Sequence, residues 1–218
     1  MAIRSQEVLA TLEETGVVAV IRVEDPENLT EVSRALCAGG VRLVEITMTV
    51  PGALALIAAV SASLSDTVLI GAGTVLDAAT ARMAILAGAR FVVGPSFDPE
   101  VVAMCKLYDT PVMPGCLTPT EIATAWKAGA DVVKIFPGRV GTPEYFQDLK
   151  GPFPQVRMMP TGNVDLVTTP AYIKAGAVAV GVGKALVDPR ATAARQYKVI
   201  TDNAVTFRRL VQEARGRR

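Results

Sequence analysis

Eight short runs rich in β-branched residues recur along the chain, and a helix-like segment follows each of them. This alternation predicts repeated βα units that build a parallel sheet. The predicted strands cover residues 17–23, 43–49, 67–75, 91–96, 111–117, 131–137, 155–164 and 177–186. One further helix is predicted near residues 5–14, before the first strand.

Tight turns connect these predicted helices to the strands that follow. Ala-Gly pairs such as Ala87-Gly88 and Ala175-Gly176 come directly before a strand, and glycine tolerates the positive φ that ends many helices. At the opposite end of the helices, Thr118 and Glu121 have the spacing of a capping box. With connections this short, 218 residues suffice for eight units. We therefore predict one domain over residues 1–218, a (β/α)8 TIM barrel with an extra N-terminal helix.

An open doubly wound sheet is the alternative architecture. Its candidate dinucleotide loop would be Gly71-Ala72-Gly73-Thr74. That segment belongs to the third unit and lacks the third glycine of the dinucleotide-binding pattern, so the sequence favours the barrel.

Composition excludes several classes of function. The net charge of +1 gives no reason to expect a nucleic-acid or membrane partner. Cys37, Cys105 and Cys116 are widely spaced, which predicts neither disulfides nor a zinc cluster and fits a reducing cytoplasm. The chain contains no histidine, the commonest transition-metal ligand and general base. We expect no metal and no cofactor, and any chemistry must use other side chains.

Two charged residues interrupt strands that should otherwise be apolar. Lys134 stands between valine and isoleucine, and Glu45 does the same in the second strand. A charge inside a buried strand is costly unless it is paired or functional. In a barrel the apolar face of each strand meets the helices, so the period-2 alternation sends the other face inward. The predicted inward residues are Glu45, Thr47 and Thr49 in one strand and Val132, Lys134 and Phe136 in the other.

The pair formed by Lys134 and Glu45 has a catalytic interpretation and a purely structural one. Apolar surroundings disfavour the charged form of a lysine and expose a nucleophilic amine, which Schiff-base formation on a carbonyl requires. A neighbouring glutamate can serve as general acid and base. An ionised Glu45 would oppose the first effect by favouring charged Lys134, and the sequence leaves that balance open. The structural reading is a buried ion pair without chemistry.

The ends of the last two predicted strands resemble barrel phosphate sites, where glycines let loop amides approach an anion. The candidate segments there are Pro160-Thr161-Gly162-Asn163-Val164 and Gly181-Val182-Gly183-Lys184, with Thr161, Gly162, Asn163, Gly183 and Lys184 as the predicted binding residues. The alternative is that these glycines only permit tight turns. Thr74, Pro95 and Gly115 are predicted at the same rim. Arg22, which closes the first strand, is a candidate to bind a carboxylate bidentately or else a solvated rim residue.

Taken together, these residues resemble the KDPG/KHG aldolase family, the 2-keto-3-deoxy-6-phosphogluconate and 4-hydroxy-2-oxoglutarate aldolases. The resemblance covers nearly the whole chain. The matching segments are Val44-Glu45-Ile46-Thr47, Gly71-Ala72-Gly73-Thr74-Val75, Met113-Pro114-Gly115, Val133-Lys134-Ile135-Phe136-Pro137, Gly151-Pro152-Phe153 and Pro160-Thr161-Gly162.

The resemblance implies a homotrimeric, metal-free class I aldolase in which Lys134 forms the Schiff base and Glu45 transfers protons. The implied substrate is a small 2-keto acid, with phosphorylated 2-keto-3-deoxy-6-phosphogluconate expected first, that is cleaved to pyruvate and glyceraldehyde 3-phosphate, or to pyruvate and glyoxylate. Thr49 stands where many members have arginine, Asn163 replaces a glycine, and Lys184 replaces a common serine. These departures leave 4-hydroxy-2-oxoglutarate and the phosphogalactonate epimer as alternative substrates. A non-catalytic phosphoester-binding barrel is the alternative from another class.

Overall fold

The computed structural model describes residues 3–64 and 67–216. The strands are β1 (Val17–Ile21), β2 (Leu43–Thr47), β3 (Leu69–Gly73), β4 (Val92–Val93), β5 (Val112–Met113), β6 (Gly115–Cys116), β7 (Val133–Ile135), β8 (Met158–Pro160) and β9 (Val180–Val182). The helices are α1 (Ile3–Thr15), α2 (Pro26–Ala38), α3 (Ala53–Leu64), α4 (Ala78–Leu86), α5 (Pro99–Leu107), α6 (Pro119–Lys127), α7 (Pro143–Lys150), α8 (Thr168–Lys174), α9 (Pro189–Ala193) and α10 (Tyr197–Ala214). None of the described helices has the length and apolar character needed to cross a membrane.

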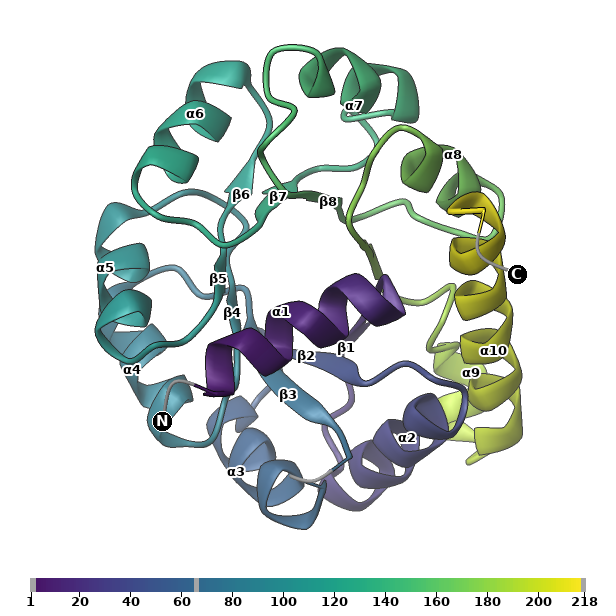
Figure 1. Ribbon diagram of the computed structural model, residues 1–218. Coiled ribbons are helices and arrows are strands. Elements are labelled where there is room, and N and C mark those ends of the chain that lie inside the picture. The colour runs from purple at the N-terminus through teal and green to yellow at the C-terminus, as the bar shows by residue number, and fades with distance from the viewer. Residues whose placement is uncertain (1–2, 65–66, 217–218) are drawn as a thin grey trace.

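All strand pairing is parallel, as predicted, and the sheet curls around a central axis with the helices outside it (Figure 1). Hydrogen bonding orders the strands as β5-β4-β3-β2-β1-β9 in one sheet and β6-β7-β8 in a second. Every predicted strand is present but shorter than predicted, and the fifth is divided into β5 and β6 at Pro114. Proline has no N–H to donate to a neighbouring strand, which accounts for a break at this residue.

The helices begin where the sequence places capping residues. The Asp25 carboxylate accepts hydrogen bonds from the first amides of α2, and Asp98 does the same for α5. The predicted capping box of α6 is confirmed, because Thr118 accepts from the Glu121 amide while the Glu121 carboxylate accepts from the Thr118 amide. These contacts satisfy amides that have no partner within their own helix.

Two apolar clusters lie on opposite faces of the sheet. The outer cluster joins the strands to the surrounding helices. The inner cluster gathers inward-facing side chains near the amino ends of the strands, among them Leu43, Phe91 and Met159, and Val8 and Leu12 of α1 pack against them. Figure 1 shows α1 crossing the ring of strands. The amino end of the inner face is therefore closed by apolar packing, and the opposite end is left for the site.

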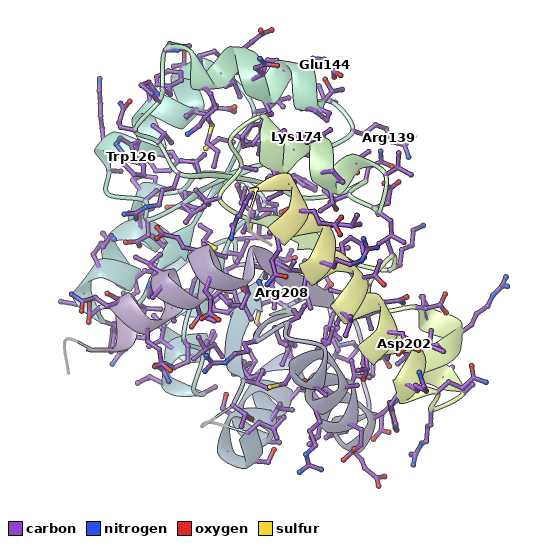
Figure 2. The ribbon with its side chains drawn as sticks, turned by 45° about the vertical axis from the view of Figure 1, so that its right-hand side comes forward. Trp126, Arg139, Glu144, Lys174, Asp202 and Arg208 are labelled. Atoms are coloured by element: carbon purple, nitrogen blue, oxygen red, sulfur yellow. The ribbon has the colours of Figure 1, made fainter. Side chains whose placement is uncertain are left out.

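Two arginines, Arg208 in α10 and Arg215 directly after it, hold the carboxyl end of α1. Arg208 donates to the carbonyl oxygens of Glu14 and Thr15, and Figure 2 shows its side chain lying toward α1. Arg215 donates to the carbonyls of Glu13 and Val178. The last carbonyls of a helix carry partial negative charge and lack partners within the helix, so cations stabilise them.

Arg208→Ala should lower the free energy of unfolding by about 1.5–3 kcal/mol, because charge-assisted hydrogen bonds to partly buried carbonyls are lost. Arg209→Ala is the matched control, since Arg209 is its exposed neighbour and forms an ion pair with the equally exposed Glu213. That change should cost no more than about 0.5 kcal/mol. Urea unfolding of both variants tests this, and equal midpoints would contradict the role of Arg208.

Candidate active site

A cavity of about 650 Å³ opens at the carboxyl ends of the strands, above the inner apolar cluster. Most of the predicted site residues line it. They are Arg22, Glu45, Thr49, Thr74, Pro95, Lys134, Phe136, Thr161, Gly162, Asn163, Gly183 and Lys184. Val164 and Gly181, which belong to the two predicted phosphate-binding segments, also line it. Three further lining residues were not singled out by the sequence, namely Val20, Asp165 and Ala185. The carboxyl end of a parallel α/β sheet is where ligand sites of this class form.

Lys134 and Glu45 face this cavity from almost complete burial. Lys134 is 5% exposed and Glu45 is 1% exposed. The strand alternation predicts that Lys134 faces inward like Val132, two residues earlier. In the structure Val132 belongs to the inner apolar cluster and Lys134 lines the cavity above it. The Lys134 Nζ lies 4.9 Å from the centroid of the Phe136 ring, within the range of a cation–π contact. The amine is thus held among apolar groups and open to a ligand in the cavity.

Burial raises the pKa of the Glu45 carboxyl, and the nearby charges of Lys134 and Arg22 only partly offset it. One carboxylate oxygen, Oε2, has no hydrogen-bond partner among the described residues. Buried polar atoms of native proteins are rarely left unpaired, so such an atom facing a cavity marks a place for a ligand group. A carboxyl whose pKa is raised is suited to both accepting and donating a proton near neutral pH.

Gly73 makes room for this carboxyl. A Cβ built at Gly73 would lie 1.9 Å from Glu45 Oε1 and 2.5 Å from Glu45 Cδ. Strands β2 and β3 pair Thr47 with Gly73, so the glycine sits beside the end of the strand that carries Glu45. The position of the carboxyl therefore depends on a missing side chain in the next strand.

The rim has unusual backbone conformations. Thr74 adopts φ 57°, which is a true outlier for a β-branched residue and costs on the order of 1–3 kcal/mol. Gly162 and Asn163 follow one another at φ 86° and 57°. Asparagine tolerates this region better than most residues, so Asn163 can continue the sharp turn that Gly162 begins. Backbone outliers of this kind cluster at ligand-binding sites.

The Thr161 hydroxyl is the second unpaired polar group of the cavity. Its Oγ1 is buried and has no hydrogen-bond partner in the described part of the chain. Gly181 leaves the room for it, because a Cβ at that position would lie 2.3 Å from Thr161 Oγ1. An isolated parallel bridge joins the two residues.

Two predicted binding residues are not among those lining the cavity. Thr47 is fully buried, and its hydroxyl lies 2.9 Å from the Thr49 hydroxyl, which does line the cavity. Gly115 permits a close approach of two loops, since a Cβ there would lie 2.2 Å from the Pro95 carbonyl oxygen. These placements give Thr47 and Gly115 supporting positions behind the surface of the site.

Asp165 is the one charged lining residue that the sequence analysis did not name. Its carboxylate accepts hydrogen bonds from the amides of Val167 and Thr168, and the bond from Thr168 is the main cause of its lowered pKa. The spacing of an aspartate three residues before a threonine at a helix start was the available signal. Asp165 is an ionised residue that fixes the start of α8 at the edge of the cavity.

This arrangement suits amine chemistry on a carbonyl compound that also carries anionic groups. Lys134 supplies the amine, Glu45 a carboxyl for proton transfer, and Arg22 and Lys184 two cations at the rim. Within the described residues, no group of three histidine, cysteine, aspartate or glutamate side chains is placed to hold a metal ion. The fold and site define an α/β protein with a buried lysine in a cavity at the carboxyl ends of its strands.

The chain belongs to the KDPG and KHG aldolase family, whose family model matches residues 8–203. It is 36% identical over 195 residues to the 2-dehydro-3-deoxy-phosphogluconate aldolase of Treponema pallidum, covering 89% of this chain and 92% of that protein. The KHG/KDPG aldolase of Escherichia coli is 32% identical over 186 residues, covering 85% and 87% of the two chains. A crystal structure of the KDPG aldolase of Legionella pneumophila, with pyruvate captured at low pH as a covalent carbinolamine intermediate, has a TM-score of 0.85 at 27% identity and covers 91% of this chain and 97% of that one.

Gly73→Ala should reduce kcat for aldol cleavage by about 10²-fold, because the added methyl group displaces the Glu45 carboxyl by a distance on the order of 1 Å. In a Glu45→Ala background, which removes the clash, the same change should have little further effect. Steady-state kinetics of the two single variants and the double variant test this coupling. Fully additive losses would show that Gly73 does not act through Glu45.

Proposed function

We propose that this protein is a class I aldolase that cleaves 2-keto-3-deoxy-6-phosphogluconate to pyruvate and glyceraldehyde 3-phosphate through a Schiff base on Lys134. The observation that carries the proposal is a nearly buried Lys134 facing the same cavity as a buried, partly unpaired Glu45. Family membership and the covalent carbinolamine captured in the Legionella relative support it.

In this mechanism the neutral amine of Lys134 attacks the keto carbon, and loss of water gives an iminium. The iminium accepts the electron pair of the C3–C4 bond as that bond breaks, so the route needs no metal ion. Glu45 takes the proton of the C4 hydroxyl as the aldehyde forms. It then returns a proton to C3 of the enamine, and water releases pyruvate and restores the amine. The raised pKa of Glu45 suits this double role.

Binding residues are assigned by their charge and place. Arg22 takes the substrate carboxylate, in place of the arginine that many family members have at Thr49. Thr161, the turn at Gly162 and Asn163, Gly183 and Lys184 take the phosphate. Thr74, Pro95 and Phe136 shape the space around the reacting carbons. The unpaired Thr161 hydroxyl and the positive φ of Gly162 and Asn163 support the phosphate site.

A closed (β/α)8 barrel formed by one domain over residues 1–218 is part of the same proposal. Counting β5 and β6 as one strand divided at Pro114 gives eight strands, and the Thr161–Gly181 bridge joins the end of β8 to β9.

We also propose a homotrimer. Exposed apolar side chains on and beside α4 and α5 offer a surface for it, namely Leu76, Met83, Leu86 and Leu107. The three free cysteines fit the cytoplasmic location that the sequence predicts.

Lys134→Ala should abolish turnover of the phosphorylated substrate while leaving the unfolding transition intact, because the proposed imine forms on the Lys134 amine. Wild-type protein should cleave 2-keto-3-deoxy-6-phosphogluconate with a higher kcat/KM than its unphosphorylated analogue or 4-hydroxy-2-oxoglutarate. Coupled detection of pyruvate measures each rate. Substantial activity of the variant would refute the role of Lys134, and equal rates on all substrates would refute the phosphate site.

The pH dependence of cleavage should report Glu45. The group must be ionised to take the C4 proton, so kcat/KM should rise with pH across a pKa above that of an ordinary glutamate. Glu45→Gln, which cannot titrate, should lower the rate by about 10²- to 10⁴-fold and remove this limb from the residual activity. A limb that persists in the Glu45→Gln variant would assign the proton transfer to another group.

A further inference from the structure

A second cavity, of about 500 Å³, adjoins the first one and shares Val20, Arg22 and Lys184 with it. It lies between the segment that follows β1 and the segment that joins β9 to α9. The first cavity alone, at about 650 Å³, already falls within the range of about 300–1,000 Å³ typical of small-ligand sites. The second cavity therefore offers room beyond that needed for a compact sugar acid.

The walls of the second cavity are more aliphatic than the boundary between the two cavities, which carries two cations. Arg22 and Lys184 stand where the cavities meet, and the described chain gives neither of them an ion pair. Beyond them the walls are the aliphatic side chains of Val23, Val187, Pro189 and Ala193, with carboxylates of Glu24 and Asp25 also lining the cavity. A second anion would meet these carboxylates, whereas an uncharged apolar group would bury surface against the aliphatic walls.

One polar group of the second cavity has no partner. Thr192 is 5% exposed, and its Oγ1 has no hydrogen bond within the described residues. The neighbouring Asn28 is already engaged, because its amide donates to the Thr192 carbonyl and its oxygen accepts from the Tyr197 hydroxyl. The Thr192 hydroxyl is thus a buried group of a fixed wall that a ligand can satisfy.

We propose that this second cavity is a lobe of the active site that receives an uncharged apolar group at the far end of an aldehyde. The protein then forms and cleaves 4-hydroxy-2-keto acids with apolar tails, an activity additional to that on phosphorylated sugar acids. This proposal rests on the proposed function, because it uses the same Lys134 and Glu45.

The reaction balances without a further reactant. Glu45 takes a proton from the methyl group of the pyruvate imine on Lys134, which gives the enamine. The enamine carbon forms a bond to the aldehyde carbon, and the aldehyde oxygen takes the proton from Glu45 to become the C4 hydroxyl. Water then hydrolyses the iminium, releases the 4-hydroxy-2-keto acid and restores the amine. No atom is oxidised or reduced by an external reagent.

The test is the condensation of pyruvate with a series of straight-chain aldehydes from propanal to octanal, with glyceraldehyde 3-phosphate as the reference. Each methylene group buried in the lobe should raise kcat/KM by roughly two- to fourfold until the lobe is filled. A hydroxyl group near the end of the tail should raise it further through Thr192, and Thr192→Val should remove that gain. A series that stays flat with chain length would overturn the proposal.

Two neighbouring alanines give a matched pair of variants. Ala193 and Ala194 are both exposed. Ala193 lines the lobe, whereas Ala194 does not. Ala193→Leu should lower kcat/KM for octanal about tenfold and leave condensation with glyceraldehyde 3-phosphate unchanged. Ala194→Leu should change neither. Equal effects of the two variants on octanal would overturn the lobe. Failure of the wild type with glyceraldehyde 3-phosphate would instead refute the proposed function itself.

Discussion

Burial of two ionisable side chains on the inner face of an apolar sheet is the constraint on which this structure depends. Lys134 and Glu45 are almost completely enclosed, and a charge in such a place is costly unless other charges or ligands compensate it. Lys134 and Arg22 partly offset the effect of burial on the Glu45 carboxyl. The apolar layer beneath, closed by Val8 and Leu12 of α1, keeps both groups at the open end of the sheet. The proposed reaction, in which the Lys134 amine bonds to the substrate and Glu45 moves the protons, gives a reason to keep this arrangement.

Absent side chains shape the inner face as much as present ones. Gly71 leaves the space that the Phe91 ring fills, Gly73 the space of the Glu45 carboxyl and Gly181 that of the Thr161 hydroxyl. Each glycine stands in a strand next to a larger group that leans over it, so large and small residues fit together across the sheet. The site is therefore built from pairs of strands rather than from single residues.

The sequence predicted the placement of the central residues because strand alternation is a local property. Counting two residues at a time from Val132 puts Lys134 and Phe136 inward, and the cavity contains both. What the sequence missed depends on neighbouring segments. The glycines at 73 and 181 read as turn or anion-binding residues, yet they face Glu45 and Thr161. The second cavity lies between segments that are distant in the sequence, since Arg22 and Lys184, which both line it, are 162 positions apart.

The most direct test of the account is the mass of the intact protein after incubation with pyruvate and sodium borohydride, followed by peptide mapping. Borohydride reduces a transient imine to a stable amine, so the adduct records which lysine reacted. The account predicts one reduced pyruvate adduct per chain, located on Lys134 and lost in Lys134→Ala. A folded, ligand-binding sample that forms no adduct, or one that carries it on another lysine such as Lys184, would contradict the central claim.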